Sequence, residues 1–385
     1  MNFAFSEEQE ELRRSVRRFL EDKSPLAEVR RLMETEEGYD PAVWAQMGNQ
    51  LGLQALAIPE AYGGAGFSYV ELVLVLEEMG RSLLCAPYLS SVALAANALL
   101  TSGDEQAKKE LLPPIASGEA VATLALSEDG GRLDLEAVAT RAHANGGSGW
   151  TLEGQKTFVV DGHVADLLLV AARAPAGLSL FAVQGDAPGL TRAPLPTMDQ
   201  TRKLARLQLS GTPARLVGTE GQAGAGLSRC LDLASVALAA EQVGGAQRCL
   251  DMSVEYAKAR VQFGRPIGSF QAIKHKCADM LLEVESARSA AYYAGWVAAA
   301  ALGGPDVAGG DGTSGEELPV VASLAKAYCS DAYFHAAAEN IQIHGGIGFT
   351  WEHDAHLYFK RAKSSQLLLG DPTFHRELLA RRIGI

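Results

Sequence analysis

The strongest constraint on the fold is that the hydrophobic period of this 385-residue chain changes twice. Apolar residues recur at helical spacing through residues 1–120, and short β-type runs separated by Gly, Pro and Asp then fill residues 121–222. Helical spacing returns in residues 223–385, where long segments are joined by short connections. This order predicts an α+β multidomain protein: an N-terminal helical domain, a middle β-barrel or sandwich domain and a C-terminal four-helix bundle.

Local signals refine this outline. Ser6 and Gln9 form an S-x-x-Q capping box, which predicts the start of the first helix. The stretch "DEQAKKELLPPIASG" predicts a short helix that stops at Pro113 and Pro114. "ARLQLSG" and "ARLVG" predict two separate strands at the end of the β domain. The glycine-rich residues 303–317 predict a surface loop.

Composition excludes several classes of protein. The formal net charge is -12 and no polybasic run offsets it, which argues against nucleic acid or an anionic membrane as a partner. No signal peptide and no apolar run of about 18 residues is present, so we expect a cytoplasmic protein without a membrane span. The five cysteines lack a C-x-x-C pair, and the eight histidines show no H-E-x-x-H spacing. We therefore predict free thiols and no metal site.

Four motifs in a fixed order carry a specific resemblance. Each glycine motif is weak alone, because a Gly-Gly pair is most often a helix stop. Together, and in the order helical, β, helical, the motifs resemble the acyl-CoA dehydrogenase family over essentially the whole chain. They are "IPEAYGGAG", "LEGQKTFVVDG", "RVQFGRPIGSFQAIKHKCADM" and "ENIQIHGGIGFTWEHDAHLYFKRAK".

The resemblance implies a flavoprotein that binds FAD between the β domain and the bundle. It also implies a dimer of dimers in which a neighbouring subunit completes each FAD site. Nine positions of this sequence match the family's cofactor contacts. They are Leu126, Ser127, Phe158, Arg260, Phe263, Gln271, Gln342, Gly345 and Gly346.

The implied roles of these residues follow from their positions in the motifs. Arg260 would meet the FAD pyrophosphate, for which a guanidinium is suited, and Phe263 and Gln271 would pack near the adenosine end. Residues 342–346 would bring backbone groups to the same phosphates across the subunit interface, which glycine permits. Leu126 and Ser127 would face the isoalloxazine, and Phe158 would cover it.

Two of these assignments have ordinary structural alternatives. Arg260 could be a solvated cation that complements the end of a helix. Phe158 could be an aromatic residue of the barrel core.

The sequence departs from the family where the catalytic base should be. Members usually remove the acyl α-proton with a glutamate before a Gly-Thr near the C-terminus, and Leu369 occupies that place here. A minority carry the base on the first bundle helix, where this chain has Ala234. Asp371 is a further candidate, but an Asp before a Pro more often caps a helix. His344, inside the glycine motif, is more simply a structural histidine.

Glu241 is therefore the candidate base. It is the only acid between Leu233 and Leu250, and it lies on the same helical face as Ala234, about 10 Å further along the axis. Three hypotheses stay open: Glu241 is a relocated catalytic base, a buried structural acid with a bundle partner, or an exposed and inert residue. A carboxylate on an apolar face beside a flavin would suit a general base.

Two classes of function follow from the resemblance. In the first, the protein is an FAD-dependent acyl-CoA dehydrogenase that forms a 2-enoyl-CoA by α-proton abstraction and β-hydride transfer. It would pass electrons to an electron-transfer flavoprotein and assemble as a homotetramer or an α2β2 heterotetramer. Small residues on the first bundle helix hint weakly at a bulky, steroid-like acyl group.

In the second class, the chain is a non-catalytic subunit that completes the FAD site of a heteromeric dehydrogenase. A redox-neutral enzyme or an oxidase on the same fold is a further alternative.

Overall fold

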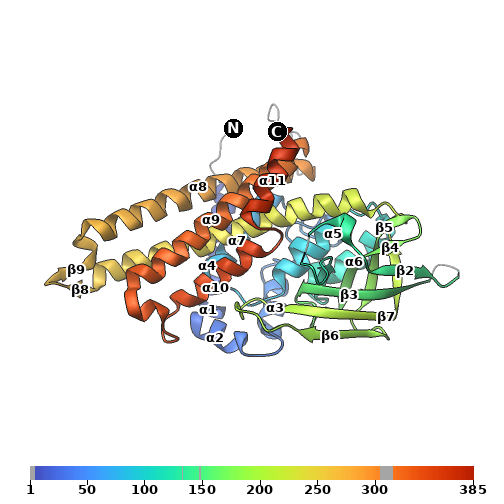
Figure 1. The fold of residues 1–385 in the computed structure, drawn as a ribbon, viewed down its shortest axis with the longest axis horizontal. Helices are drawn as coiled ribbons and strands as arrows, with labels where there is room; N and C mark the ends of the chain where they lie inside the picture. Colours follow the sequence, from blue (N-terminus) through green and yellow to red (C-terminus); the bar gives the residue numbers. More distant parts are fainter. Residues whose placement is uncertain (1–4, 132, 147–148, 304–314) are drawn as a thin grey trace. The chain divides into compact units, whose positions relative to one another are not determined.

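The computed structural model describes residues 5–131, 133–146, 149–303 and 315–385 (Figure 1). Most of the predicted glycine-rich surface loop therefore lies outside the described residues. The chain divides into two compact units. The helical unit comprises Met1–Arg30, Ser68–Leu84 and Ser235–Ile385, and the sheet unit comprises Arg31–Phe67 and Cys85–Ala234. The domain boundaries at residues 120 and 222 remain a prediction.

The helical unit is built from long helices, of which α8 and α10 pack against α9 (Figure 1). Its first helix begins at the predicted capping box, where Ser6 and Gln9 bond each other's backbone N–H. A second capping box, between Ser68 and Glu71, starts α4. The helices are α1 (Glu7–Lys23), α2 (Leu26–Met33, leaving the unit after Arg30), α4 (Tyr69–Arg81), α7 (Ala223–Ala259, entering the unit at Ser235), α8 (Gln271–Ala301), α9 (Leu318–His344), α10 (Ala355–Leu367) and α11 (Pro372–Ile383).

Helices α4 and α7 cross with their backbones in contact. A Cβ atom added to Gly80 would lie 1.9 Å from the carbonyl oxygen of Glu241, and one added to Gly244 would lie 1.8 Å from that of Glu77. No side chain can be accommodated at such distances, so glycine is required at both positions. The residues of α4 from Tyr69 to Gly80 are all buried, which explains its nearly continuous apolar sequence.

The sheet unit contains a closed barrel. Strands β4, β2, β3, β7 and β5 pair in a ring, because β5 bonds both β7 and β4, while β1 is added beside β4 and β6 beside β7. The middle β domain is thus confirmed as a barrel. The strands are β1 (Ala122–Ala125), β2 (Arg141–Ala144), β3 (Trp150–Val160), β4 (Leu167–Ala174), β5 (Gly177–Gln184), β6 (Leu190–Pro194) and β7 (Leu204–Val217), and the helices of this unit are α3 (Pro41–Asn49), α5 (Asn97–Leu100) and α6 (Glu105–Ser117), with a π-helix at Leu89–Ala96.

Two local predictions were wrong. Helix α6 does not stop at Pro113 but continues to Ser117 and ends at Gly118, whose φ is +78°. Each proline lacks the N–H that would bond a carbonyl one turn earlier, so the helix loses those bonds, but its remaining bonds and the helix-compatible φ of proline carry it to Ser117. The two predicted final strands are one strand, β7, in which Gly211 takes a positive φ without ending the pairing with β3. The short strand β6 was not predicted.

One helix among the described residues, Ala223–Ala259, is long and apolar enough to cross a membrane by length and composition. Because 61% of its apolar window is buried within the protein, it is equally typical of a core helix. The five cysteines are free thiols, as predicted, and four of them are buried while Cys277 is partly accessible.

Candidate cofactor and active site

In the sheet unit, the loop after β1 holds two of the predicted flavin contacts. Lys156 on β3 is fully buried and donates to the carbonyl oxygen of Leu126 (3.1 Å) and to the carboxylate of Glu128 (2.8 Å). The amide N–H of Thr157 donates to the carbonyl oxygen of Ser127 (2.9 Å). The strand and the buried lysine therefore fix the backbone of residues 126–128.

The Lys156–Glu128 pair is strongly polarised. Burial lowers the pKa of Lys156 to about 8, against the opposing effect of Glu128. Burial would raise the pKa of Glu128, but hydrogen bonds from Lys156 and Thr140 together bring it down to about 2. The pair is therefore ionised near neutral pH and holds the loop in place.

Phe158 is not a barrel-core residue. Its side chain is 45% exposed and its backbone lies in the left-handed region, with φ at +59°. A bulky residue in that region is strained, and such strain is found preferentially at ligand sites. The structural alternative for Phe158 is thereby excluded, and its exposed ring fits a role in covering a planar ligand.

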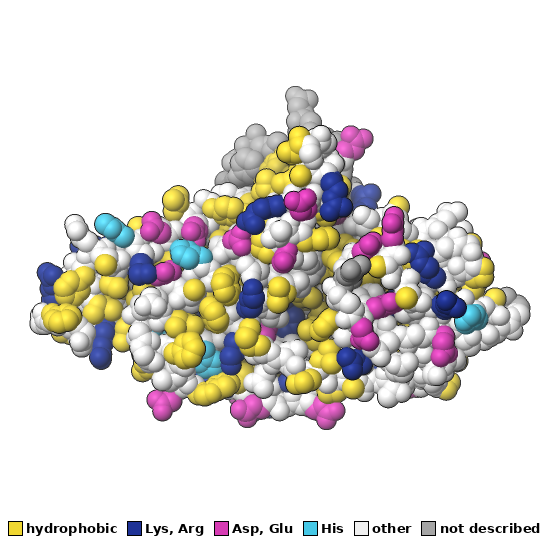
Figure 2. Space-filling view, in the orientation of Figure 1, with side chains coloured by type: hydrophobic (Ala, Val, Ile, Leu, Met, Phe, Trp, Pro, Cys, Tyr) yellow, Lys and Arg dark blue, Asp and Glu magenta, His cyan; other side chains and the backbone are white. Residues whose placement is uncertain are grey.

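In the helical unit, three predicted cofactor residues lie around the end of α7 and the β8–β9 hairpin (Val261–Gln262 and Arg265–Pro266). Arg260 and Gln271 are exposed, and Phe263 is 92% exposed with a φ of +53°. Figure 2 shows apolar side chains at the surface of this end of the unit. An exposed cation beside exposed aromatic surface is the chemistry that a dinucleotide's diphosphate and adenine require.

The glycine motif lies at the C-terminal end of α9. Gln342, Gly345 and Gly346 are exposed, and a Cβ added to either glycine would meet no atom of this chain within 4 Å. Close packing within the chain therefore does not explain Gly346, whereas a ligand or subunit approaching from outside would. His344 is buried and bonds the carbonyl oxygen of Asn340 through Nδ1 (2.7 Å), which is a structural role.

Both groups of residues lie at one end of the helical unit. The ring of His344 stacks on that of Tyr256, with 4.3 Å between centroids, and Tyr256 is four residues before Arg260. The residues present thus fit FAD: a guanidinium, exposed aromatic rings and accessible glycine backbone come together there. The roles of the individual residues remain predictions.

Glu241 is buried and ion-paired. Its carboxylate accepts a hydrogen bond from the guanidinium of Arg361 on α10, at 2.8 Å, and both side chains are less than 9% exposed. The hypothesis of an exposed, inert residue is therefore wrong. The ion pair has the geometry that the structural hypothesis requires, while a role as base remains a proposal.

At the two positions where the resemblance predicts a catalytic base, the chain has an alanine and a leucine. Ala234 is fully buried, and Leu369 is buried with a φ of +61°. Asp371 caps α11 by accepting from the amide of Phe374 (2.7 Å), as its position before Pro372 predicts.

Among the described residues of the helical unit, sequence reasoning missed two buried cations. Arg361 lies in the charged run "YFKRAKSS" and gives no sign of being the one that is buried. Lys326 stands alone in the apolar run "ASLAKAYC", and that isolation was the one available signal. It is fully buried and donates to the hydroxyl of Ser330 (2.9 Å).

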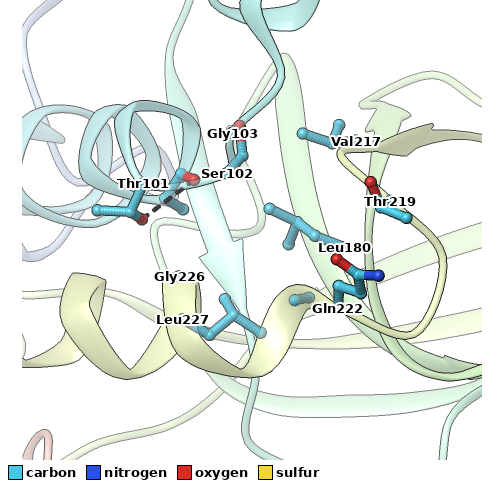
Figure 3. A pocket seen from close by; sticks show the side chains of 11 residues that line it. Thr101, Ser102, Gly103, Leu180, Val217, Thr219, Gln222, Gly226 and Leu227 are labelled. Atoms are coloured by element: carbon cyan, nitrogen blue, oxygen red, sulfur yellow. Dashed lines mark hydrogen bonds between the residues drawn. The ribbon is translucent and has the colours of Figure 1, made fainter.

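The sheet unit also contains a small pocket of about 170 Å³ beside the start of α7 (Figure 3). Its polar lining comes from Thr101, Ser102, Thr219 and Gln222, and Leu180 contributes apolar surface. No charged side chain lines it, so it cannot neutralise a phosphate group. Its size and chemistry suit water or a very small neutral molecule.

Comparison with known proteins identifies the class. Family models for the N-terminal, middle and C-terminal domains of acyl-CoA dehydrogenases match residues 6–119, 123–211 and 225–384. The chain belongs to the acyl-CoA dehydrogenase family, and is therefore an FAD-binding oxidoreductase that acts on acyl-CoA.

Individual relatives are similar over nearly the full length. Acyl-CoA dehydrogenase IpdE2 of Mycolicibacterium smegmatis is 38% identical, over 98% of both chains. A solved structure of a variant of the Tcur3481–Tcur3483 steroid acyl-CoA dehydrogenase is 32% identical with a TM-score of 0.83, over 98% of both chains. The ChsE4–ChsE5 complex of Mycobacterium tuberculosis is 29% identical with a TM-score of 0.87, covering 100% of this chain and 99% of that one.

Proposed function

We propose that this chain is one subunit of a heteromeric acyl-CoA dehydrogenase that acts on a bulky, steroid-like acyl-CoA. The reaction would form a 2-enoyl-CoA by loss of the α-proton and of the β-hydrogen as hydride. FAD, when bound, supplies the hydride acceptor. The chain's own contribution would be to bind cofactor and substrate, while the partner subunit supplies the catalytic base.

The observation that carries this proposal is the buried Glu241–Arg361 ion pair. If Glu241 accepted a proton, its carboxylate would become neutral and the buried guanidinium would lose this partner charge. Leaving a buried charge uncompensated typically costs about 3–5 kcal/mol. This cost argues against protonation of Glu241, and the side chain of Leu369 has no group that could accept a proton instead.

Two relatives support the assembly and the substrate. The ChsE4–ChsE5 structure is a complex of two differently named chains, and the Tcur3481–Tcur3483 protein is named a steroid acyl-CoA dehydrogenase. We therefore propose that the chain assembles as an α2β2 heterotetramer. We further propose that it passes electrons to an electron-transfer flavoprotein. The small residues of α7 do not add support, because Ala237, Ala239 and Ala240 are buried and serve helix packing.

A second candidate is a homomeric dehydrogenase with Glu241 as the base. The specific observation in its favour is that Arg361 stabilises the ionised carboxylate, which is the form that can accept a proton. In this version the substrate would displace the guanidinium from the carboxylate.

The test is to purify the chain expressed alone and with its genomic neighbours, and to compare flavin spectrum and subunit composition. Each preparation is then titrated anaerobically with acyl-CoAs, including one with a steroid side chain, and flavin bleaching is followed. The heteromeric proposal expects bleaching only when a second chain copurifies. Bleaching by a pure homo-oligomer would overturn it.

The Glu241→Gln variant separates the two candidates. Loss of bleaching with unchanged flavin content and thermal stability would establish Glu241 as the base. Reduced stability, with bleaching by the complex retained, would assign it to packing. Turnover without net flavin reduction, or rapid reoxidation by oxygen, would indicate redox-neutral or oxidase chemistry instead.

A further inference from the structure

The segment between α10 and α11 has an unusual backbone. Leu369 has a φ of +61° and Gly370 one of +98°, and a Cβ added to Gly370 would lie 2.4 Å from the ring of Phe374. The left-handed conformation is strained for a residue such as leucine, because its Cβ crowds the following carbonyl oxygen. Interactions elsewhere must therefore hold the segment in place.

Two buried side chains hold its carbonyl groups. Lys326 on α9 donates to the carbonyl oxygens of Gln366 (3.2 Å) and Gly370 (3.0 Å). His375 on α11 bonds the carbonyl oxygen of Leu369 through Nε2 (2.8 Å). The carbonyl group of Gln366 lies in the last turn of α10 and those of Leu369 and Gly370 follow it, where helical N–H partners run out.

Lys326 is itself fixed from a third helix. It donates to the hydroxyl of Ser330 (2.9 Å), which also accepts from the side-chain amide of Gln242 on α7 (2.9 Å). Gln242 directly follows Glu241. The three ammonium hydrogens of Lys326 thus meet three oxygen acceptors, all of them neutral, and within the described residues no carboxylate bonds this lysine.

We propose that Lys326 is a positioning residue that fixes the backbone of residues 366–370 and thereby the direction of the side chain at position 369. The clamp extends the proposed function, in which position 369 is the family's usual site of the base. Its consequence is that the backbone that would hold a catalytic base is kept, although position 369 carries a leucine in place of a base. A glutamate placed at 369 would then be held in a working position without any other change.

The first test measures the clamp without any activity. Hydrogen exchange at the amides of Leu368 and Gly370 is compared in wild type, Lys326→Met and Lys326→Arg. Loss of two or three buried hydrogen bonds predicts exchange about tenfold faster or more in Lys326→Met. Lys326→Arg, which keeps the donors, should restore part of the protection.

A matched control is Lys363→Met, which removes an amine from α10 that donates to the side-chain oxygen of Gln366 and lies over the ring of Phe334, and that bonds no carbonyl group among the described residues. Protection of residues 368–370 should be unchanged in it. Equal exchange in Lys326→Met and Lys363→Met would overturn the proposal. If Lys326→Met does not fold, exchange in Lys326→Arg is decisive. Protection partly lost at Leu368 and Gly370 alone supports the clamp, whereas protection that is unchanged there, or lost throughout the chain, refutes it.

The second test uses the chain reconstituted with FAD. Leu369→Glu should gain acyl-CoA-dependent flavin bleaching without a partner subunit, and Leu369→Glu with Lys326→Met should lose at least about tenfold of that rate. Equal rates in the two variants would refute positioning by Lys326. No bleaching in Leu369→Glu, with the clamp visible by hydrogen exchange, would instead refute the proposed location of the base.

Discussion

Lys156 in the sheet unit and Lys326 in the helical unit perform the same task in different surroundings. Both are fully buried and both donate to main-chain carbonyl groups of a loop. Lys156 also faces the carboxylate of Glu128, whereas Lys326 faces neutral oxygens. Burial lowers the pKa of Lys156 to about 8 and that of Lys326 to about 7.

The difference shows what each kind of partner contributes. Carbonyl and hydroxyl oxygens satisfy the hydrogen bonds of a buried ammonium, but they offset little of the cost of taking its charge out of water. A carboxylate offsets more of that cost, so the ion-paired lysine remains charged to higher pH. We call the hydrogen bonds of Lys156 the sheet-unit clamp and those of Lys326 the helical-unit clamp. Near neutral pH Lys156 is charged, whereas Lys326 is a mixture of the charged ammonium and the neutral amine.

The largest effect on stability is expected at the buried Glu241–Arg361 ion pair of the helical unit. Arg361→Met leaves Glu241 buried without this partner, so the free energy of unfolding should fall by about 3–5 kcal/mol. Urea unfolding at neutral pH measures it. Arg376→Met, which breaks an exposed pair with Asp331, is the control and should cost less than about 1 kcal/mol. Equal losses would mean that burial does not distinguish the two pairs.

Glu128→Gln should be the next largest change. It leaves Lys156 buried with neutral partners, which is the situation of Lys326. We therefore expect the free energy of unfolding at pH 7 to fall by about 2–3 kcal/mol. The loss should shrink above about pH 9, because the lysine is then neutral. Asp129→Asn, at the neighbouring exposed acid, is the control. A loss that does not change with pH would contradict the assigned cause.

The pH dependence of stability compares the two lysines directly. Both have a folded pKa below the ordinary value of 10.5, so above the folded pKa the unfolded chain binds more protons and stability rises with pH. From about pH 6 to pH 9, the stability difference between wild type and Lys326→Met should shift in favour of wild type by about 2–3 kcal/mol. For Lys156→Met the shift should be about 1 kcal/mol.

The groups around Lys326 determine how cleanly this difference can be measured. Cys329 and Asp331 on α9 and Asp371 before α11 act on it, as does the imidazole of His375, whose pKa burial lowers to about 4. The imidazole is neutral throughout the range from pH 6 to 9. Chemical denaturation of wild type, Lys326→Met and Lys156→Met at pH 6 and pH 9 measures these stability differences. Equal pH-dependent shifts for the two variants would contradict the proposed difference between the lysines.

The smallest effect is expected for Ser330→Ala. Its hydroxyl joins Lys326 to Gln242, and Lys326 keeps its two carbonyl acceptors, so the loss should be about 1 kcal/mol. Ser289→Ala, at an exposed serine whose hydroxyl bonds the carbonyl of Glu285, should be nearly neutral. Thermal unfolding at neutral pH resolves the two. Equal stabilities of the two variants would mean that the hydrogen bonds of Ser330 to Lys326 and Gln242 do not contribute to the free energy of unfolding.

Features set by neighbouring residues were predictable from the sequence. The capping box at Ser6 and the cap at Asp371 depend on residues three positions apart, and both were predicted correctly. The alternation of helical and strand periods predicted the three-part architecture, which the fold and the family confirm. Glu241 was singled out because a lone acid on an apolar face is itself a signal.

Features set by distant contacts were not predictable. The acceptors of Lys326 are carbonyl groups 40 and 44 residues away, and a carbonyl group leaves no mark in the sequence. Strand β6 has no buried residue and no strand-like run of apolar residues, and it is defined by its pairing with β7. The left-handed backbone of Phe158 and Leu369 is likewise imposed by surroundings, since neither residue type favours it.

The crossing of α4 and α7 limits how the helical unit can move. Gly80 packs against the backbone of Glu241 and Gly244 packs against that of Glu77, so the backbone of each helix lies directly against a glycine of the other. Sliding by even one residue would drive a side chain into a carbonyl group. Shear between these helices is thereby blocked, and they can respond to a bound substrate only as one rigid body. The two glycines therefore determine where Glu241 lies: a methyl group at residue 80 would collide with the carbonyl group and Cγ of Glu241, and one at residue 244 would collide with the carbonyl group of Glu77.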